Sequence, residues 1–227
     1  MSTRRSVPLR PGANAAPSQT PRRLLAHLAP ARAVEVVGPS GIATQRMILR
    51  PLRETDRTPF LRAIEASRDH LERWIPLHHP GETDDEFFDR QWTLTQSGDS
   101  KGGSWRRVGV LPDGRIVGGF NLNAIARGLQ SSADANWWIS SEFLRQGFAR
   151  EGVEAMLRHA FTDLPAGLGL HTVHAGIAPS NEASIRLARS LNFKHDPGVQ
   201  SYLRVGDRWE LHDIFAISVL DAHALAG

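Results

Sequence analysis

The sequence predicts an α/β fold in which helices cover both faces of a mixed β-sheet. Two observations support this fold class. Segments with strand-like alternation are interleaved with segments of helical periodicity in the order β-α-α-β-β-β-α-β-α-β-β. The hydrophobic fraction is 41% over 227 residues, which is enough for one substantial core. No internal repeat is visible, so we expect one domain over residues 36–222.

The first half of the chain contains one strand, two helices and a hairpin. Residues 45–53 alternate like a strand, and residues 55–68 have helical spacing with Thr55 as the expected N-cap. Residues 71–77 are expected to form a short turn or helix that carries Trp74 to a groove, and residues 83–96 a helix capped by Thr83. The turn signal Pro112-Asp113-Gly114 joins strands 105–111 and 115–123. Gly118-Gly119 in the second strand indicates a bulge or a close backbone approach.

The second half alternates strands and helices and ends in two strands. Strand 132–140 turns Trp137 and Trp138 to opposite faces of the sheet. The other expected elements are helix 148–161, strand 170–177, helix 181–191 and strands 201–205 and 210–219.

Positive charge is concentrated at the beginning of the chain. Residues 1–34 hold six arginines and no acidic residue, and the whole chain has a net charge of +3, so the remainder carries −3. We expect residues 1–35 to be a disordered basic extension, since their Pro, Ala, Ser and Arg show no periodicity. A basic arm that contacts RNA or the ribosome, a targeting peptide and a solvated tail all fit this composition.

The composition also excludes several classes of site. The absence of cysteine rules out disulfides, thiolate metal sites and a cysteine nucleophile, and suits a cytoplasmic protein. No apolar run reaches the roughly 18–20 residues that span a bilayer, so we expect no membrane insertion. His171 and His174 fall on opposite faces of one strand, and His78-His79 and His212-Asp213 lack ligand spacing. We predict no metal.

A strand, a short loop and a glycine-containing turn precede the helix at residues 148–161. Gly147 lacks a side chain where the backbone would face a ligand, and Ala149 keeps the next approach open. Unpaired N–H groups at a helix start lie at the positive end of the helix dipole and suit a pyrophosphate. Arg145 and Arg150 bracket this turn and add positive charge.

A second segment makes the pattern specific. Asn181-Glu182-Ala183-Ser184 opens a helix that ends at Leu191-Asn192-Phe193. The order of these motifs resembles the GNAT superfamily of acetyltransferases, and within it the Rim-type (RimJ/RimL) branch that acetylates protein N-termini. The other segments that carry the resemblance are ILRPLRETD, LERWIPL, ANWWIS, RQGFAREGVEAML and GDRWELHDIFAIS. The resemblance covers most of residues 46–219. Asn192 stands where the family usually has glycine, and asparagine tolerates left-handed backbone geometry.

The resemblance implies a mostly antiparallel sheet of six to seven strands with a V-shaped opening between strands 137–140 and 172–176, which holds acetyl-CoA as co-substrate. Main-chain groups near Trp138 and Ile139 would pair with the pantetheine, and Asn181 would bind the cofactor arm. The pyrophosphate would be held by the amides of Arg145, Gln146, Gly147, Phe148, Ala149 and Arg150.

The resemblance also assigns catalytic roles without a covalent enzyme intermediate. Asp134 would be the general base, through water, unless it is a surface carboxylate. Ser184 would return a proton to the CoA thiolate, unless it only caps its helix. Trp74 and Trp138 would line the acceptor site, with Tyr202 facing the acceptor amine unless its role is structural.

The expected acceptor is the N-terminal α-amine of a protein or peptide. Alternatives are a small amine such as an antibiotic or metabolite, a non-catalytic acyl-CoA-binding protein, and an RNA-binding protein. A wide acidic groove by Glu72, Asp84 and Asp85 would favour a peptide, and a closed apolar pocket a small molecule. The chain would be a monomer or a homodimer.

Overall fold

The structure is a computed structural model that describes residues 41–205 and 208–222. The expected basic extension, residues 1–35, lies outside the described residues. The elements, in chain order, are β1 Ile42–Ala43, β2 Ile48–Arg50, η1 Glu54–Asp56, α2 Arg57–Glu65, α3 Arg68–Leu71, α4 Asp84–Lys101, β3 Trp105–Val110, β4 Ile116–Ala126, β5 Ser132–Ile139, η2 Ser141–Phe143, α5 Phe148–Phe161, β6 Thr172–Ile177, α6 Glu182–Ser190, β7 Lys194–Val205, β8 Arg208–Ser218 and α7 Val219–Ala222.

One mixed sheet forms the centre of the fold. Within the described residues it has eight strands in the order β1-β2-β3-β4-β5-β6-β8-β7, and of the neighbouring pairs only β5 and β6 run parallel. The prediction of a mixed, mostly antiparallel sheet is confirmed, with eight strands in place of six to seven. The additional strand, β1, has two residues, which is too short to produce alternation in the sequence.

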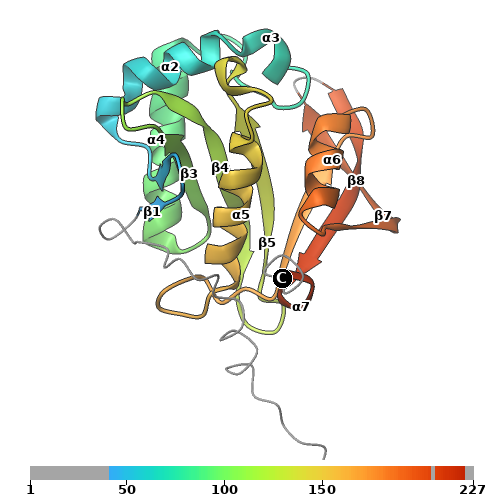
Figure 1. The fold of residues 1–227 in the computed structure, drawn as a ribbon. Coiled ribbons are helices and arrows are strands. Elements are labelled where there is room, and N and C mark those ends of the chain that lie inside the picture. Colours follow the sequence, from blue (N-terminus) through green and yellow to red (C-terminus); the bar gives the residue numbers. More distant parts are fainter. Residues whose placement is uncertain (1–40, 206–207, 223–227) are drawn as a thin grey trace, which may run out of the picture.

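Helices cover both faces of this sheet, as predicted (Figure 1). On one face α5 and α6 pack over a core that includes Phe120, Met156 and Leu191. On the opposite face α2 and α4 pack over a second core that includes Phe60 and Phe88. Burial of these large side chains away from water stabilises the two layers against the sheet.

Two predicted helices have the expected starts. Helix α5 covers residues 148–161 as predicted, and its Val153 and Met156 are fully buried. Thr83 caps α4 through a capping box with Glu86. This helix continues past residue 96 to Lys101 and ends at Gly102, which has the left-handed φ of 67°. The extension runs through residues 97–100, whose poor helix propensity does not predict it.

The predicted N-cap Thr55 is wrong. Thr55 lies inside η1, and Asp56 precedes α2 instead. The buried Asp56 carboxylate accepts hydrogen bonds from the Arg50 guanidinium at 2.6 and 2.8 Å and from the Arg53 N–H at 2.8 Å. This ion pair fixes the entry into α2, and the predicted helix 55–68 is also divided, because α2 ends at Glu65.

Glycine permits a close backbone approach between β4 and β5. A Cβ at Gly118 would lie 2.1 Å from the Trp138 carbonyl oxygen, and one at Gly119 would lie 2.2 Å from Trp138 Nε1. The indole of Trp138 therefore lies over Gly119, which confirms the predicted close approach. Asn192 has the left-handed φ of 64°, the geometry that its place after α6 predicts.

Candidate functional site

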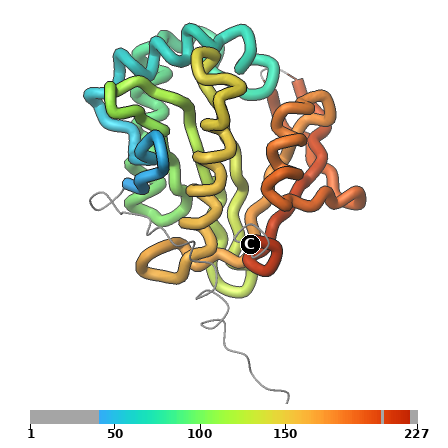
Figure 2. The backbone as a smooth tube through the Cα atoms, in the orientation of Figure 1, coloured from blue at the N-terminus to red at the C-terminus, as the bar shows by residue number. Residues whose placement is uncertain are grey.

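Strands β5 and β6 begin side by side and then separate. They pair in parallel from Ser132 and Thr172 to Asp134 and His174, and the pairing ends there although both strands continue. The two traces run close together at the lower end of the sheet and diverge toward its upper end (Figures 1 and 2). Beyond Asp134 the two facing strand edges are therefore not hydrogen-bonded to each other. We call this interval the strand gap.

The alternation of the β4–β5 ladder shows which groups of β5 face the strand gap. Residues of an antiparallel strand turn their main-chain groups alternately to one neighbour and to the other. Ser140 N–H donates to the Val117 carbonyl at 2.8 Å, so Trp138, two residues earlier, also turns its main chain toward β4. The main-chain groups of Trp137 and Ile139 then face the gap. Of the two residues predicted to pair with the pantetheine, Ile139 has this orientation and Trp138 does not.

The same reasoning applies to β6. Val219 N–H donates to the His171 carbonyl at 2.9 Å, which fixes the hydrogen-bonded positions of the β6–β8 pair. Gly176 therefore turns its N–H and carbonyl toward β5, across the gap from β5. An extended ligand between the strands would meet unpaired main-chain groups on both sides.

The turn before α5 leaves helix amides unpaired. Gly147 is the N-cap, with φ of 83°, and Arg145 also has a positive φ, 60°. The Glu151 N–H donates to the Gly147 carbonyl at 3.1 Å and begins the helical bonding. Within the described residues, no hydrogen bond engages the amides of residues 148–150. Helix α5 begins at the upper end of the sheet, where β5 and β6 lie far apart (Figure 1).

Arg46, from the turn between β1 and β2, lies against this helix start. Its Nε donates to Glu151 Oε2 at 2.7 Å and its Nη1 to the Gln146 carbonyl at 2.8 Å. Its guanidinium carbon lies 4.0 Å from the centroid of the Phe148 ring. A Cβ at Gly147 would lie 3.4 Å from Arg46 Nη2. The turn thus carries a guanidinium from a distant segment, which is ion-paired with Glu151 of the same helix.

The two bracketing arginines have different surroundings. The Arg150 guanidinium donates from Nη1 to the Ser190 carbonyl at 3.2 Å and hydroxyl at 3.1 Å, and its Nε lies 2.8 Å from Glu154. Its side chain therefore connects α5 to the end of α6, and its contribution to the turn is its main-chain N–H. Arg145 is exposed.

Asn181 and Ser184 lie together at the start of α6. The Ser184 N–H donates to Asn181 Oδ1 at 3.1 Å, so the asparagine side chain caps this helix. Within the part of the chain that the structure describes, the half-buried Ser184 hydroxyl has no protein hydrogen-bond partner. Its hydroxyl is therefore not used for capping and is available to a ligand.

Asp134 lies where the strands begin to separate. Its Oδ1 is 4.0 Å from His174 Nδ1 on β6, and the Asp134 side chain is 68% exposed. Both residues alternate with buried alanine or valine neighbours, so they share the sheet face that α2 and α4 cover. The structure therefore brings a carboxylate and an imidazole together at the narrow end of the strand gap.

The three aromatic acceptor candidates do not converge on one point. Trp138 packs edge-to-face on Phe60, with ring centroids 6.0 Å apart, and faces the α2–α4 layer. Trp74 lies half-buried after α3. Tyr202 is 64% exposed on β7, which β8 separates from β6. Trp138 thus lies on a strand that borders the gap, whereas Tyr202 lies two strands from the gap.

A row of polar side chains crosses the sheet beneath the α2–α4 layer. Asn121 Nδ2 donates to Asn136 Oδ1 at 2.8 Å, and Arg106 donates to Asn123 Oδ1 and Gln91 Oε1, both at 2.9 Å. A cavity of about 30 Å³ beside this row is lined in part by Arg106, Asn121 and Trp138. That volume admits one or two water molecules. The cavity is not the closed apolar pocket that would favour a small molecule.

Comparison with known proteins identifies the family. The Acetyltransferase (GNAT) domain model matches residues 46–194, which is more than half of the chain. The chain belongs to the GNAT acetyltransferase family. The match contains the strand gap, the turn before α5 and the whole of α6, so the features built above all lie within the GNAT domain.

Individual relatives agree with the GNAT assignment. The chain is 24% identical over 170 residues to the probable N-acetyltransferase YjcK of Bacillus subtilis (strain 168), covering 74% of this chain and 92% of the relative. It is similar to Mycobacterium smegmatis RimJ in complex with CoA-disulfide, with a TM-score of 0.71, 25% identity, and 83% and 94% of the two chains covered. The spermidine N-acetyltransferase of Vibrio cholerae, in complex with CoA and spermine, shares the fold with a TM-score of 0.62, 20% identity, and 78% and 98% covered.

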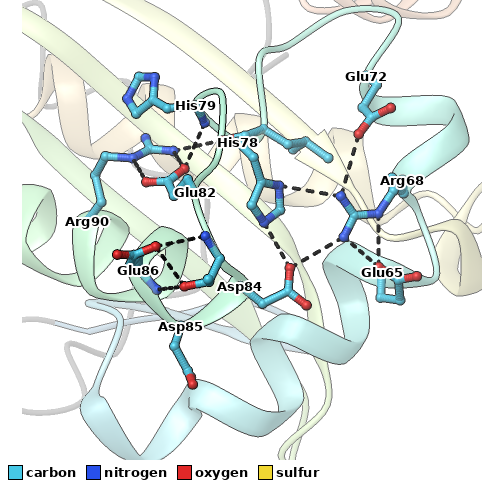
Figure 3. A network of polar contacts seen from close by, with 12 residues as sticks. Glu65, Arg68, Glu72, His78, His79, Glu82, Asp84, Asp85, Glu86 and Arg90 are labelled. Atoms are coloured by element: carbon cyan, nitrogen blue, oxygen red, sulfur yellow. Dashed lines mark hydrogen bonds and ion pairs between the residues drawn. The ribbon is translucent and has the colours of Figure 1, made fainter.

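The acidic residues on the α2–α4 side of this GNAT domain are paired with arginines. Figure 3 shows Arg68 between Glu65, Asp84 and Glu72. The nitrogen–oxygen distances of these ion pairs are 2.6, 3.4 and 3.6 Å. Arg57 lies 3.1 Å from Asp85. The three carboxylates expected to form an acidic groove are thus partly neutralised within the chain.

Sequence reasoning missed Arg46, Arg106 and the row of asparagines. Asn121, Asn123 and Asn136 have a signal in the sequence, because they are polar residues inside strands that helices cover. Arg46 has no such signal in the sequence, since its partners are about 100 residues away. Among residues 41–205 and 208–222, no group of three or more His, Asp or Glu side chains is placed to hold a metal, and no helix is long and apolar enough to cross a membrane.

Proposed function

We propose that the protein transfers the acetyl group of acetyl-CoA to the N-terminal α-amine of a protein or peptide. The observation that carries the proposal is the strand gap, which leads from Asp134 to the unpaired amides at the start of α5. The likeness to RimJ, whose structure contains a CoA-disulfide, supports acetyl-CoA as the co-substrate.

Groups of this chain fit the diphosphate and the pantetheine of acetyl-CoA. The amides of residues 145–150, at the positive end of the α5 dipole, would hold the diphosphate, with Arg46 adding charge. Pantetheine amides would pair with the main chain of Trp137 and Ile139 as an added strand. Asn181 would orient the pantetheine arm of acetyl-CoA near the thioester. The Asn181 side chain already accepts from the Ser184 N–H, and this cap fixes its position at the start of α6.

The proposed chemistry uses Asp134, at the narrow end of the strand gap, and Ser184, at the start of α6. The neutral amine attacks the thioester carbonyl carbon, a C–N bond forms and the C–S bond breaks. Asp134, directly or through water, takes the proton that the amine nitrogen loses. The unpartnered Ser184 hydroxyl gives a proton to the CoA thiolate. A main-chain N–H of β5 that faces the gap stabilises the developing oxyanion.

Three other functions remain as alternatives. The likeness to a spermidine acetyltransferase favours a small amine, and that structure was solved with CoA and spermine. A non-catalytic CoA-binding protein would keep the gap and the turn without turnover. RNA or ribosome binding would depend on residues 1–34, which lie outside the described residues. The cytoplasmic location, the monomeric or homodimeric state and the absence of a metal also stay predictions.

Thiol release from acetyl-CoA, measured with a panel of peptides and small amines, tests the proposal. Peptides with a free α-amine should be acetylated, and the same peptides with a blocked N-terminus should not. Calorimetry should show binding of acetyl-CoA. Absence of binding would exclude the family's co-substrate, binding without turnover would favour the non-catalytic reading, and turnover confined to polyamines would replace the peptide acceptor.

A further inference from the structure

Arg106, in the polar row, differs from the other inward-facing arginines that the structure describes. Arg106 is half-buried, and both of its hydrogen bonds go to neutral amide oxygens, those of Asn123 and Gln91. By contrast, Arg50 pairs with Asp56 at 2.6 Å and Arg107 with Asp99 at 2.9 Å. Within the described residues, no carboxylate lies within ion-pair distance of Arg106.

An arginine in this position carries an energetic penalty. Removing a guanidinium from water is costly unless an opposite charge compensates it. Burial lowers the pKa of Arg106, and the charge of Arg90 lowers it further. Amide oxygens satisfy some of the five N–H donors but leave the charge uncompensated. A group that the chain does not supply would therefore bind here with favourable electrostatics.

The position of Arg106 connects it to the reaction centre. It lines the cavity together with Asn121 and Trp138. Asn123, which accepts its hydrogen bond, lies opposite Asp134 in the β4–β5 register. Side chains of such a cross-strand pair share a face and lie about 5 Å apart. The Arg106 guanidinium is thus roughly 8–10 Å from the Asp134 carboxylate, along one face of the sheet.

We propose that the acceptor amine belongs to a molecule that also carries a carboxylate, and that Arg106 binds this carboxylate while the amine lies at Asp134. This inference rests on the proposed function, since it names the acceptor class of the same site. An N-terminal peptide whose second residue is Asp or Glu spans the required distance, at about 3.5 Å of chain per residue plus the side chain. The peptide would lie over the polar side chains of Arg106, Asn121 and Asn136.

A matched pair of peptides tests the proposal on the full chain. The two differ only at the second residue, Asp in one and Asn in the other, and kcat/KM is measured for both. Wild type should prefer the acidic peptide about 10–100-fold, the value of one or two charge-assisted hydrogen bonds. Arg106→Gln should reduce the preference to within about threefold, while Arg186→Gln, on an exposed part of α6, should keep it.

A second variant tests the same proposal in case Arg106→Gln fails to fold. Gln91→Glu keeps the guanidinium but gives it a carboxylate at its present hydrogen-bond position. The preference for the acidic peptide should fall here too, because the charge is already compensated. Calorimetry with acetyl-CoA should give an unchanged Kd for both variants, since neither residue is in the strand gap. An acidic preference that survives in both variants would overturn the assignment of Arg106.

Further acceptors separate the remaining outcomes. A peptide with phosphoserine second would reveal a phosphate preference, which would replace the carboxylate as the bound group. Turnover with equal rates for acidic and neutral peptides would overturn the inference and leave the proposed function intact. Absence of thiol release with every amine, whatever its charge, would instead overturn the proposed function.

Discussion

The guanidinium carbon of Arg46 lies 4.0 Å from the centroid of the Phe148 ring, across a contact between the β1–β2 turn and the first residue of α5. Glu151 and the Gln146 carbonyl hold the same guanidinium at 2.7 and 2.8 Å. These contacts place the charge beside Gly147, where the helix amides are unpaired. The diphosphate site proposed for this turn therefore joins two segments that are far apart in the sequence.

Replacing Arg46 with alanine should weaken acetyl-CoA binding about tenfold. The change removes one charge-assisted contact, worth about 1.5–3 kcal/mol in general, and part of this is screened because the side chain is 40% exposed. Titration calorimetry at two salt concentrations measures the effect. Glu151→Gln is the matched control, because it breaks the same ion pair and keeps the guanidinium. Equal losses in both variants would show that Arg46 only supports the turn.

Gly147→Ala should reduce acetyl-CoA affinity more than tenfold. Gly147 has φ of 83°, where a side chain costs about 1–2 kcal/mol, so the turn should relax and misalign its amides. Gly128→Ala is a control with matched strain, since its φ is 78° and no atom lies within 4 Å of the added Cβ. It should lower the melting temperature similarly and leave the Kd for acetyl-CoA unchanged. Equal Kd values for the two variants would argue against a role of this turn in binding.

Much of the proposed diphosphate site is local in sequence and can be predicted from it. Helix α5 has its predicted bounds because its apolar stripe follows helical periodicity, and Gly147 stands where the backbone needs a positive φ. The predicted strand 132–140 forms β5 almost as expected, and Trp138 lies on the face opposite Trp137. Local periodicity and backbone conformation suffice for these features.

The proposed acceptor site depends on contacts that periodicity does not specify. Arg106 meets Gln91 from α4 and Asn123 from β4, and its lack of a carboxylate partner is visible only when these elements are placed together. The His174–Asp134 pair needs the parallel register of β5 and β6. The error at Thr55 has the same origin, because the ion pair between Arg50 and Asp56 decides where α2 begins.

Asp134→Asn should lower kcat about 100-fold at neutral pH, the lower end of the usual contribution of a general base. The amide cannot accept the ammonium proton, while the exposed position of Asp134 means that the fold should tolerate the change. Steady-state thiol release with saturating acetyl-CoA measures kcat, and calorimetry should show an unchanged Kd for acetyl-CoA. An unchanged kcat would assign proton removal to other groups, with His174 the nearest candidate.

Ser184→Ala should reduce turnover about 10–100-fold, slightly below the usual effect of losing a proton donor. Because Asn181 accepts from the Ser184 main-chain N–H, the alanine variant keeps the cap of α6 and its stability. The loss should shrink when the leaving thiol is more acidic, since a stable thiolate needs less help from a proton donor. Wild-type turnover in this variant would remove Ser184 from the mechanism.

His159 should make the protein less stable as the pH falls from about 6.5 to 4. Burial, and then the charge of Arg107, lowers the pKa of this histidine from 6.5 to about 4. Between these values the unfolded chain binds a proton that the folded chain does not, so the free energy of unfolding rises with pH across this window. The contribution of His159 to the free energy of unfolding is at most about 3 kcal/mol. It is fully present above pH 6.5 and is lost as the pH approaches 4.

His159→Phe should remove this contribution and keep the ring against Trp105, whose centroid lies 5.0 Å away. Urea unfolding at pH 4.5 and 7.5 measures the difference in both proteins. The decrease between the two pH values should be smaller in the variant by about 2–3 kcal/mol, because its phenyl ring stays uncharged in both states. The same decrease in variant and wild type would mean that other groups, and not the half-buried imidazole of His159, make the fold sensitive to acid.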